Sequence, residues 1–127
     1  MRLNEEEINR SIATFVEWDN HERVLPFEDL NTGLKGLIAI HNTNLGPATG
    51  GTRYWSYSSE REALRDVLNL SKAMTYKCAM AGLPYGGGKA VIIANPRYRK
   101  TEALLKAYTH KVNLLKGHFY TGEDVGI

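Results

Sequence analysis

Apolar residues recur three or four positions apart in three stretches of the chain, and this spacing predicts three amphipathic helices. They are expected from Asn4 to about Asn20, from Ser59 to about Ala81 and from Thr101 to about Lys116. Ser59 and Glu62 form a capping box at the start of the second helix. Its apolar stripe leads to Lys77, which is therefore expected on the buried face. The stripe of the first helix is Ile8, Ile12, Phe15 and Val16, and that of the second is Ala63, Val67, Leu70 and Met74.

Shorter apolar runs between these helices predict strands at residues 23–27, 34–41, 49–55, 90–94 and 118–121. Pro26 confines the first strand to an edge of the sheet, because proline donates no ladder hydrogen bond. Gly50 and Gly51 weaken the third strand and mark close approach by another backbone or a ligand. In the second half of the chain, strands alternate with helices. The expected fold class is therefore α/β, a three-layer α-β-α domain with a mostly parallel sheet and an edge strand near the N-terminus.

The run LPYGGGKAVIIANP, which starts at Leu83, sets Lys89 directly behind three glycines and ahead of an expected strand. Glycines bare the backbone and let another group come very close, so this loop suits a small-molecule site. The familiar glycine motifs do not fit. A Walker loop needs glycine at Leu83 and Ser or Thr at Ala90, and the fingerprint G-x-G-x-x-G needs glycine at Val91. A tight turn that carries a solvated lysine is the alternative interpretation.

Ligands of open α/β sheets gather at the carboxyl ends of the strands, and three charged groups are expected to converge there. Lys89 flanks one strand, Asp124 follows another, and Lys77 ends the helix between them. Two lysines and a carboxylate suit a substrate with its own carboxylate and an amino or carbonyl group. Simpler interpretations exist: Lys77 compensates the helix dipole, and from spacing alone Asp124 fits a solvated loop acid. Arg53 is a candidate to pair with an acid in the sheet.

The composition is that of a soluble globular domain, with 24% charged and 43% hydrophobic residues among 127. A formal net charge of +2 gives no bulk drive toward nucleic acid or a membrane, and no apolar run is long enough to span a bilayer. One cysteine, Cys78, excludes an internal disulfide, fits a reducing cytoplasm and is expected in the core. The histidines show no metal spacing and no metal is expected; they are His21, His41, His110 and His118.

Four blocks in order resemble the glutamate/leucine/phenylalanine/valine dehydrogenase family, and the resemblance extends over residues 33–127. LPYGGGKAVIIANP is similar to the family's active-site pattern. IAIHNTNLGPATGGTRYW resembles the loop and strand that open the substrate pocket in the leucine and phenylalanine branches, and MTYK and TGEDVG match two further blocks. The resemblance implies an amino-acid dehydrogenase, closest to leucine dehydrogenase, that catalyses reversible oxidative deamination of an L-amino acid with NAD.

The resemblance also implies a role for each candidate residue. Lys77 would hold the substrate α-carboxylate, and Lys89 would activate water and assist carbinolamine formation. Asp124 would exchange protons with the substrate nitrogen. Five further residues are expected to line the substrate pocket: Thr49, Gly50, Gly51, Met74 and Gly122.

Two of these positions bear on the choice of substrate. Thr49 stands where glutamate enzymes of the family have lysine and leucine enzymes usually have leucine, so glutamate is not expected. Gly122 replaces the alanine that is common in leucine enzymes, and a wider pocket favours phenylalanine. We expect a branched-chain amino acid, leucine or valine, with phenylalanine as the alternative. A non-enzymatic assembly or amino-acid-sensing module is the alternative of a different class.

Members of the family carry a dinucleotide-binding (Rossmann) domain after the matching region, and this chain contains no G-x-G-x-x-G. Residues 1–127 are therefore expected to be a substrate-binding and oligomerisation domain that is inactive without a C-terminal cofactor domain. NAD is the expected cofactor, with NADP as the alternative, and that other domain would bind it. The resemblance further implies a homo-oligomer, with residues 23–27 as a candidate pairing edge. The small-molecule partner is an amino acid or its 2-oxo acid.

Overall fold

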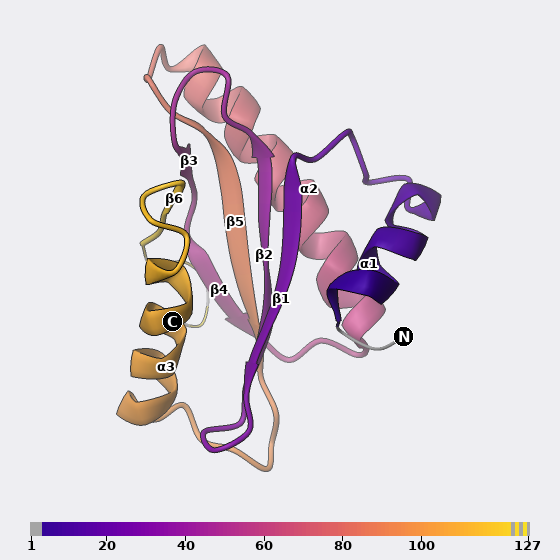
Figure 1. Ribbon diagram of the computed structural model, residues 1–127, viewed down its shortest axis with the longest axis vertical. Coiled ribbons are helices and arrows are strands. Elements are labelled where there is room, and N and C mark those ends of the chain that lie inside the picture. The colour runs from indigo at the N-terminus through magenta and orange to yellow at the C-terminus, as the bar shows by residue number, and fades with distance from the viewer. Residues whose placement is uncertain (1–3, 123, 125, 127) are drawn as a thin grey trace.

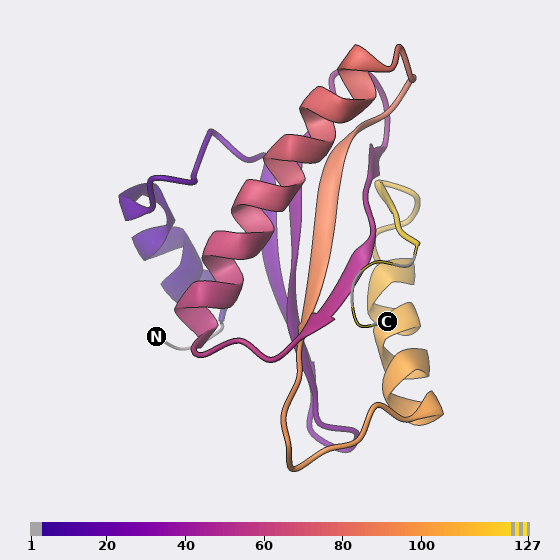
Figure 2. The same ribbon diagram turned by 180° about the vertical axis from the view of Figure 1, so that it is seen from behind.

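The computed structural model describes residues 4–122, 124 and 126 and shows helices on both faces of one sheet (Figure 1). α2 runs along one face with α1 beside it, as Figure 2 shows from behind, and α3 covers the other face. The three predicted layers are therefore confirmed. In chain order the elements are α1 (Glu5–Ser11), the 3-10 helix η1 (Ile12–Thr14), β1 (Arg23–Asp29), β2 (Leu34–Asn42), β3 (Ala48–Thr49), β4 (Thr52–Trp55), α2 (Glu60–Met80), β5 (Gly86–Ile93), α3 (Glu102–Asn113) and β6 (Phe119–Tyr120).

Within the described residues, the sheet has six strands in the order β1-β2-β5-β3-β6, and β4 also pairs with β5. β1 lies at one edge and pairs antiparallel with β2, which pairs antiparallel with β5. The pairings of β3 and β4 with β5, and of β6 with β3, are parallel. The sheet is mixed because a short turn joins β1 to β2, whereas α2 joins β4 to β5 and α3 joins β5 to β6. The α/β class and the N-terminal edge strand are confirmed.

α1, α2 and α3 each begin at a side chain that caps the first turn. Asn4, Ser59 and Thr101 accept a hydrogen bond from the backbone N–H three residues later, at 2.8, 3.1 and 3.1 Å. These bonds satisfy amides that have no partner inside the helix. α2 ends where Gly82 adopts a φ of +69°, a conformation that glycine takes without steric cost. The predicted start and end of the second helix are therefore confirmed.

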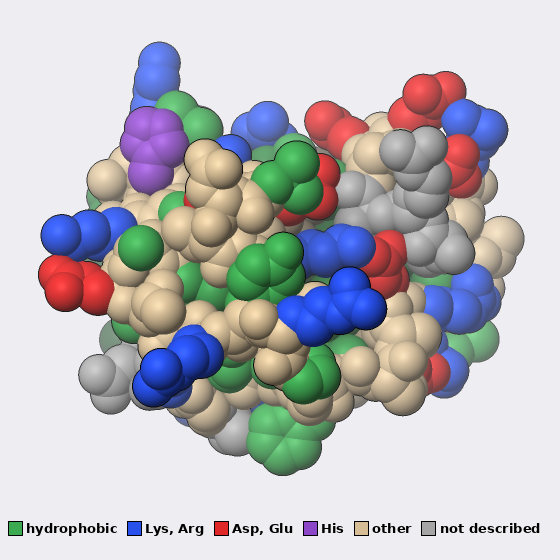
Figure 3. Space-filling view, turned by 90° about the horizontal axis from the view of Figure 1, so that it is seen from below, with side chains coloured by type: hydrophobic (Ala, Val, Ile, Leu, Met, Phe, Trp, Pro, Cys, Tyr) green, Lys and Arg blue, Asp and Glu red, His purple; other side chains and the backbone are tan. Residues whose placement is uncertain are grey.

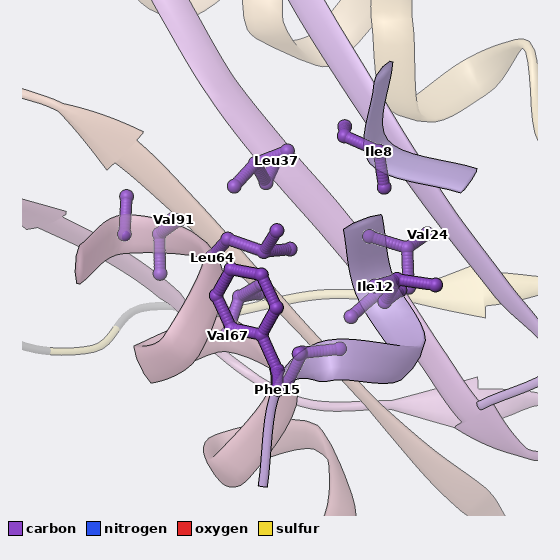
Figure 4. Packing of buried hydrophobic residues seen from close by; sticks show 11 residues of the cluster. Ile8, Ile12, Phe15, Val24, Leu37, Leu64, Val67 and Val91 are labelled. Carbon is purple, nitrogen blue, oxygen red and sulfur yellow. The ribbon is translucent and has the colours of Figure 1, made fainter. Parts of the chain in front are cut away.

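An apolar core lies on each face of the sheet. On one face, α1, η1 and α2 pack against β1, β2 and β5. Figure 4 shows Ile8, Ile12 and Phe15 gathered with Leu64 and Val67 of α2. On the other face, residues of α3 pack against β2, β5 and β6. Burying these side chains is the main favourable term that holds α2 and α3 on the sheet.

The first helix is shorter than predicted. α1 ends at Ser11, η1 follows, and Phe15 has an extended backbone with φ −82° and ψ 131°. Ile8, Ile12 and Phe15 are buried as predicted, but Val16 is 88% exposed. The prediction of a helix to Asn20 is wrong, because Phe15 reaches the core from extended backbone and no further turn is needed to bury it.

Two strand boundaries also differ from the prediction. β5 begins at Gly86, so the three glycines and Lys89 lie inside the strand and not in a loop before it. The strand predicted at 49–55 is instead β3 and β4, which are separated at Gly50 and Gly51. Glycine has a low strand propensity, but pairing with β2 on one side and β3 on the other holds the glycines of β5 in the sheet.

Candidate active site

The glycines of β5 let other parts of the same chain lie directly on the sheet. A Cβ atom on Gly87 would lie 2.2 Å from the backbone nitrogen of Thr75 in α2. One on Gly86 would lie 1.9 Å from the carbonyl oxygen of Asn42 in β2. Protein backbone therefore occupies the space at these two glycines that the sequence assigned to a ligand. The glycines serve the site indirectly, because they set the close packing of α2 on β5.

Lys89 is buried on this same face of the sheet. Side chains alternate along a strand, so Lys89 faces α2, as Gly87 does two residues earlier. The residue is 7% exposed, and its Nζ lies 2.9 Å from Oδ2 of Asp124. Asp124 follows β6 and is itself largely buried, with 24% of its side chain exposed. The structure therefore brings two of the three predicted charged groups together, and Asp124 is not a solvated loop acid.

Arg53 supplies a second cation to the same carboxylate. Its Nε donates to Oδ2 of Asp124 at 3.1 Å, and its Nη1 lies 3.4 Å from Oδ2 of Asp66 in α2. The hydroxyl of Tyr57 donates to Asp66. Burial raises the pKa of Tyr57 and the hydrogen bond to Asp66 raises it further, so the hydroxyl stays protonated. Arg53 therefore pairs with acids as predicted, but the two acids lie in α2 and after β6 and not in a strand of the sheet.

A hydroxyl cluster fixes the segment that leads to Asp124. Thr52 Oγ1 lies 2.6 Å from Thr121 Oγ1 and also shares a hydrogen bond with the hydroxyl of Tyr108 in α3. The backbone N–H of Thr52 donates to the carbonyl of Gly122 at 2.8 Å. Burial raises the pKa of Tyr108, and the hydrogen bonds with Thr52 and Thr121 partly offset that rise. The residues just before Asp124 are thus tied to both β4 and α3.

Lys77 is exposed, so its predicted place on the buried face is wrong. The buried stripe of α2 ends with Ser71 and Cys78, and Thr75 packs on Gly87, which rotates Lys77 toward solvent. Met74 precedes Lys77 by about one turn, and its Cγ would lie 3.3 Å from a Cβ on Gly50. Lys77 therefore leaves α2 on the side that faces the break between β3 and β4. No carboxylate among the described residues pairs with its ammonium group.

The other predicted pocket residues lie at that same break. Gly50 is buried, and a Cβ on it would lie 1.7 Å from the carbonyl oxygen of Gly88. Thr49 and Gly51 are half-buried. Gly122 is exposed, and a Cβ on it would meet no atom within 4 Å. The space beside Gly122 is therefore open, as a site that admits a ligand requires.

Asp66 and Tyr57 are site residues that the sequence analysis missed. Asp66 precedes Leu70 and Met74 by about one and two helical turns, so it lies on the side of α2 that leads to Lys77. A carboxylate beside an apolar stripe was the available signal. Both residues line an open cleft of about 790 Å³ between the end of β4 and the first turns of α2. The remaining lining residues are Glu17, Arg53, Trp55, Ser56, Ser58, Glu62, Arg65 and Asn69.

Other candidate residues have structural places. Cys78 is 2% exposed, as predicted. His110 and His118 are exposed, whereas His21 and His41 are buried against each other with ring centroids 4.6 Å apart. The described residues hold no cluster of His, Cys, Asp and Glu suited to a metal ion, and none of the described helices could cross a membrane. Figure 3 shows basic and acidic side chains interspersed at the lower end of the molecule.

Comparisons with known proteins place this chain in a family. The sequence model described as Glu/Leu/Phe/Val dehydrogenase, dimerisation domain, matches residues 21–127. The chain is 56% identical over 116 residues to phenylalanine dehydrogenase of Caldalkalibacillus thermarum, and this match covers 91% of the chain and 31% of the relative. It is 53% identical over 112 residues to leucine dehydrogenase of Geobacillus stearothermophilus, which covers 88% and 30%. Valine dehydrogenase of Streptomyces virginiae is 56% identical over 106 residues, covering 84% and 30%.

A solved structure agrees with these sequence matches. The crystal structure of L-tryptophan dehydrogenase from Nostoc punctiforme matches with a TM-score of 0.79 and 48% identity, over 96% of this chain and 33% of that chain. The fold is thus that of an amino-acid dehydrogenase domain. The chain belongs to the Glu/Leu/Phe/Val dehydrogenase family. It spans about a third of the length of the curated relatives that it matches.

Proposed function

We propose that residues 1–127 are the substrate-binding and oligomerisation domain of an amino-acid dehydrogenase of the leucine dehydrogenase type. The observation that carries the proposal is the buried contact of 2.9 Å between Lys89 Nζ and Asp124 Oδ2. These are the two residues to which the resemblance gives the acid-base steps: Lys89 lies in β5, and Asp124 follows β6. A module that only assembles needs no buried lysine and aspartate beside an open space.

The proposed reaction converts an L-amino acid, water and NAD⁺ into a 2-oxo acid, ammonium, NADH and a proton. Lys77 attracts the α-carboxylate, because its ammonium is exposed and has no carboxylate partner among the described residues. The open space beside Gly122 admits the amino acid. The close packing of Gly50 on β5 keeps side-chain atoms away from the α-carbon, and Thr49 and Met74 bound the pocket on either side of Gly50.

Lys89 and Asp124 would perform the proton transfers. In its neutral form, the Lys89 amine removes a proton from the water that attacks the α-carbon of the imine, and it later assists collapse of the carbinolamine. Asp124 takes a proton from the substrate nitrogen and returns it to the leaving ammonia. Because Lys89 Nζ and Asp124 Oδ2 are in direct contact, a proton can pass from one side chain to the other.

The nicotinamide cofactor, NAD or alternatively NADP, supplies the acceptor for the hydride. The acidic and basic side chains described above suit an amino-acid substrate. The sequence contains no glycine-rich phosphate loop that would bind a dinucleotide. We therefore assign cofactor binding to a C-terminal dinucleotide-binding domain outside these residues. Relatives about three times as long as the chain support this assignment.

The substrate proposal is leucine or valine, because Thr49 offers no cation to a side-chain carboxylate. Phenylalanine is the second candidate, favoured by the open space beside Gly122 and by 56% identity to a phenylalanine dehydrogenase. A homo-oligomer is proposed because the matching family model is described as a dimerisation domain and β1 forms a sheet edge. Sedimentation of the purified chain tests this part directly: a monomer at all concentrations contradicts it.

The test of function is a fusion of this chain to the remainder of leucine dehydrogenase from Geobacillus stearothermophilus. NADH formation is measured with leucine, valine, phenylalanine and glutamate, and the intact parent enzyme is the positive control. We expect turnover of leucine or valine, slower turnover of phenylalanine and none of glutamate. The 127-residue chain alone is expected to form no NADH. A folded fusion that binds NAD but turns over no amino acid contradicts the proposal and favours an assembly or amino-acid-sensing module.

A further inference from the structure

Arg53 is the centre of a chain of contacts that the proposed reaction does not use. Its guanidinium group reaches two carboxylates in different elements, Asp124 after β6 and Asp66 in α2. Arg53 Nε and Lys89 Nζ contact the same oxygen of Asp124, at 3.1 and 2.9 Å. Oδ2 of Asp124 is therefore held between two cations.

The guanidinium group of Arg53 is also held on the side away from Asp124. Asp66 accepts from Arg53 and from the hydroxyl of Tyr57, which lies between β4 and α2. α2 in turn packs on β5 through the contact of Gly87 with Thr75. The guanidinium plane is thus fixed by the same helix that covers Lys89.

We propose that Arg53 is a positioning residue for oxidative deamination: it holds the Asp124 carboxylate against Lys89, and Asp66 and Tyr57 fix the direction of its guanidinium group. The inference rests on the proposed function, because it gives Arg53 a purpose only if Asp124 exchanges protons with a substrate. Arginine suits the task because its planar fork reaches two acids at once, whereas a lysine ammonium is a point charge.

The charge balance of the cluster fits this role. When Lys89 is protonated, the contacts between described residues set two cations, Lys89 and Arg53, against two carboxylates, Asp66 and Asp124, and the Tyr57 hydroxyl is neutral. A neutral cluster can be partly buried without an uncompensated charge. Loss of Arg53 leaves two carboxylates against one cation, so Asp124 is expected to leave its position beside Lys89.

Kinetics of the fusion enzyme test the proposal. Arg53→Ala is expected to lower kcat about 10- to 100-fold, because misplacement of a catalytic group by about 1 Å costs that much. KM for leucine should change less than about twofold, since Arg53 is not assigned to the substrate. Ethylguanidinium, which can enter the open cleft, should restore part of kcat, whereas Arg53→Lys should recover little. Arg65→Ala is the matched control, because Arg65 lines the same cleft and also pairs with two carboxylates.

A crystal structure of the Arg53→Ala chain gives a readout that needs no activity. The contact between Lys89 Nζ and Asp124 Oδ2 should be lost, and the Arg65→Ala chain should keep it. An unchanged kcat of the Arg53→Ala fusion overturns the proposal. A lowered kcat also overturns it if ethylguanidinium does not rescue the activity and the crystal structure still shows the Lys89–Asp124 contact. An inactive wild-type fusion would instead count against the proposed function, and the crystal structures would still decide whether Arg53 positions Asp124.

Discussion

Lys89 Nζ lies 2.9 Å from Asp124 Oδ2, although Lys89 is in the middle of β5 and Asp124 follows β6 at the far end of the chain. β3 lies between β5 and β6 and pairs with both, and β4 also pairs with β5. The break at Gly50 and Gly51 falls at this point of the sheet. A charge pair formed across an interrupted strand is a preformed place for acid-base chemistry.

The pair should be measurable as an energetic coupling. Lys89→Met and Asp124→Asn are each expected to lower the free energy of unfolding by about 1–3 kcal/mol, because each leaves a largely buried group without its partner. The double variant should lose less than the sum, by about 1 kcal/mol or more. Urea unfolding of the four proteins gives the coupling, and strict additivity would show that the contact contributes nothing.

The glycines of β5 should be required for the close packing of α2 on the sheet, and not only for the approach of a ligand. Gly87→Ala places a methyl group 2.2 Å from the Thr75 nitrogen, so it should lower the free energy of unfolding by about 1–3 kcal/mol. Gly122→Ala is the matched control, since a Cβ there meets no atom within 4 Å. Thermal unfolding compares the two. Equal melting temperatures would mean that α2 can move away from β5 at little cost.

The stability of the chain should fall as the pH drops below neutral, because of the cluster around His21. Asp19 N–H donates to His21 Nδ1 at 3.1 Å, and His21 Nε2 lies 2.8 Å from the Leu68 carbonyl, so the neutral ring is fully hydrogen-bonded. Burial is the main cause that lowers the pKa of His21, and positive charge on His41 and Lys72 nearby lowers it further. As the pH falls through 6.5, His21 therefore takes up a proton in the unfolded chain but stays neutral in the folded chain. The free energy of unfolding falls over this pH range.

Denaturant unfolding at a series of pH values from about 8 to about 5 measures how the free energy of unfolding depends on pH. His21→Gln should flatten the slope of unfolding free energy against pH, and the exposed His110→Gln should leave the slope unchanged. The hydrogen bond from His41 also lowers the pKa of Asp19, which adds a loss in the same direction only at pH values near and below 3.8. A stability that rises on acidification would contradict the account of this cluster.

Lys77 should act in substrate binding more than in chemistry. In the fusion enzyme, Lys77→Met should raise KM for leucine about tenfold or more, because the exposed ammonium is the proposed partner of the α-carboxylate. Its effect on kcat should be the smaller of the two. Lys106→Met is the control, since Lys106 is an exposed lysine of α3 with only a surface ion pair. A Lys77 variant with unchanged KM would remove Lys77 from the site.

The sequence predicted the elements that carry strong local signals. The capping box at Ser59 and the glycine at 82 defined α2 to within a residue, and the alternation of strands and helices predicted the parallel pairings. It also predicted that Lys89 and Asp124 converge, and that Arg53 pairs with an acid. What it could not predict was their geometry, because contacts between segments far apart in the chain depend on strand order.

The failures have physical reasons in particular residues. Gly86–Gly88 were expected in a loop because glycine is a poor strand former, yet β2 and β3 pair with this backbone from both sides. Lys77 was expected to be buried because it continues a spacing of three and four, but Thr75 against Gly87 sets the rotation of α2. Asp66 was missed because its partner Arg53 lies in another element.

The most direct test of the whole account is the rate of NADH formation from leucine by the fusion enzyme with Lys89 and with Lys89→Met. Lys106→Met controls for the loss of a lysine elsewhere. If Lys89 and Asp124 perform the proton transfers, Lys89→Met should lower kcat by about 10²- to 10⁴-fold while the protein stays folded and binds NAD. Equal rates for the two proteins would show that the contact between Lys89 and Asp124 is structural and that the active site lies elsewhere.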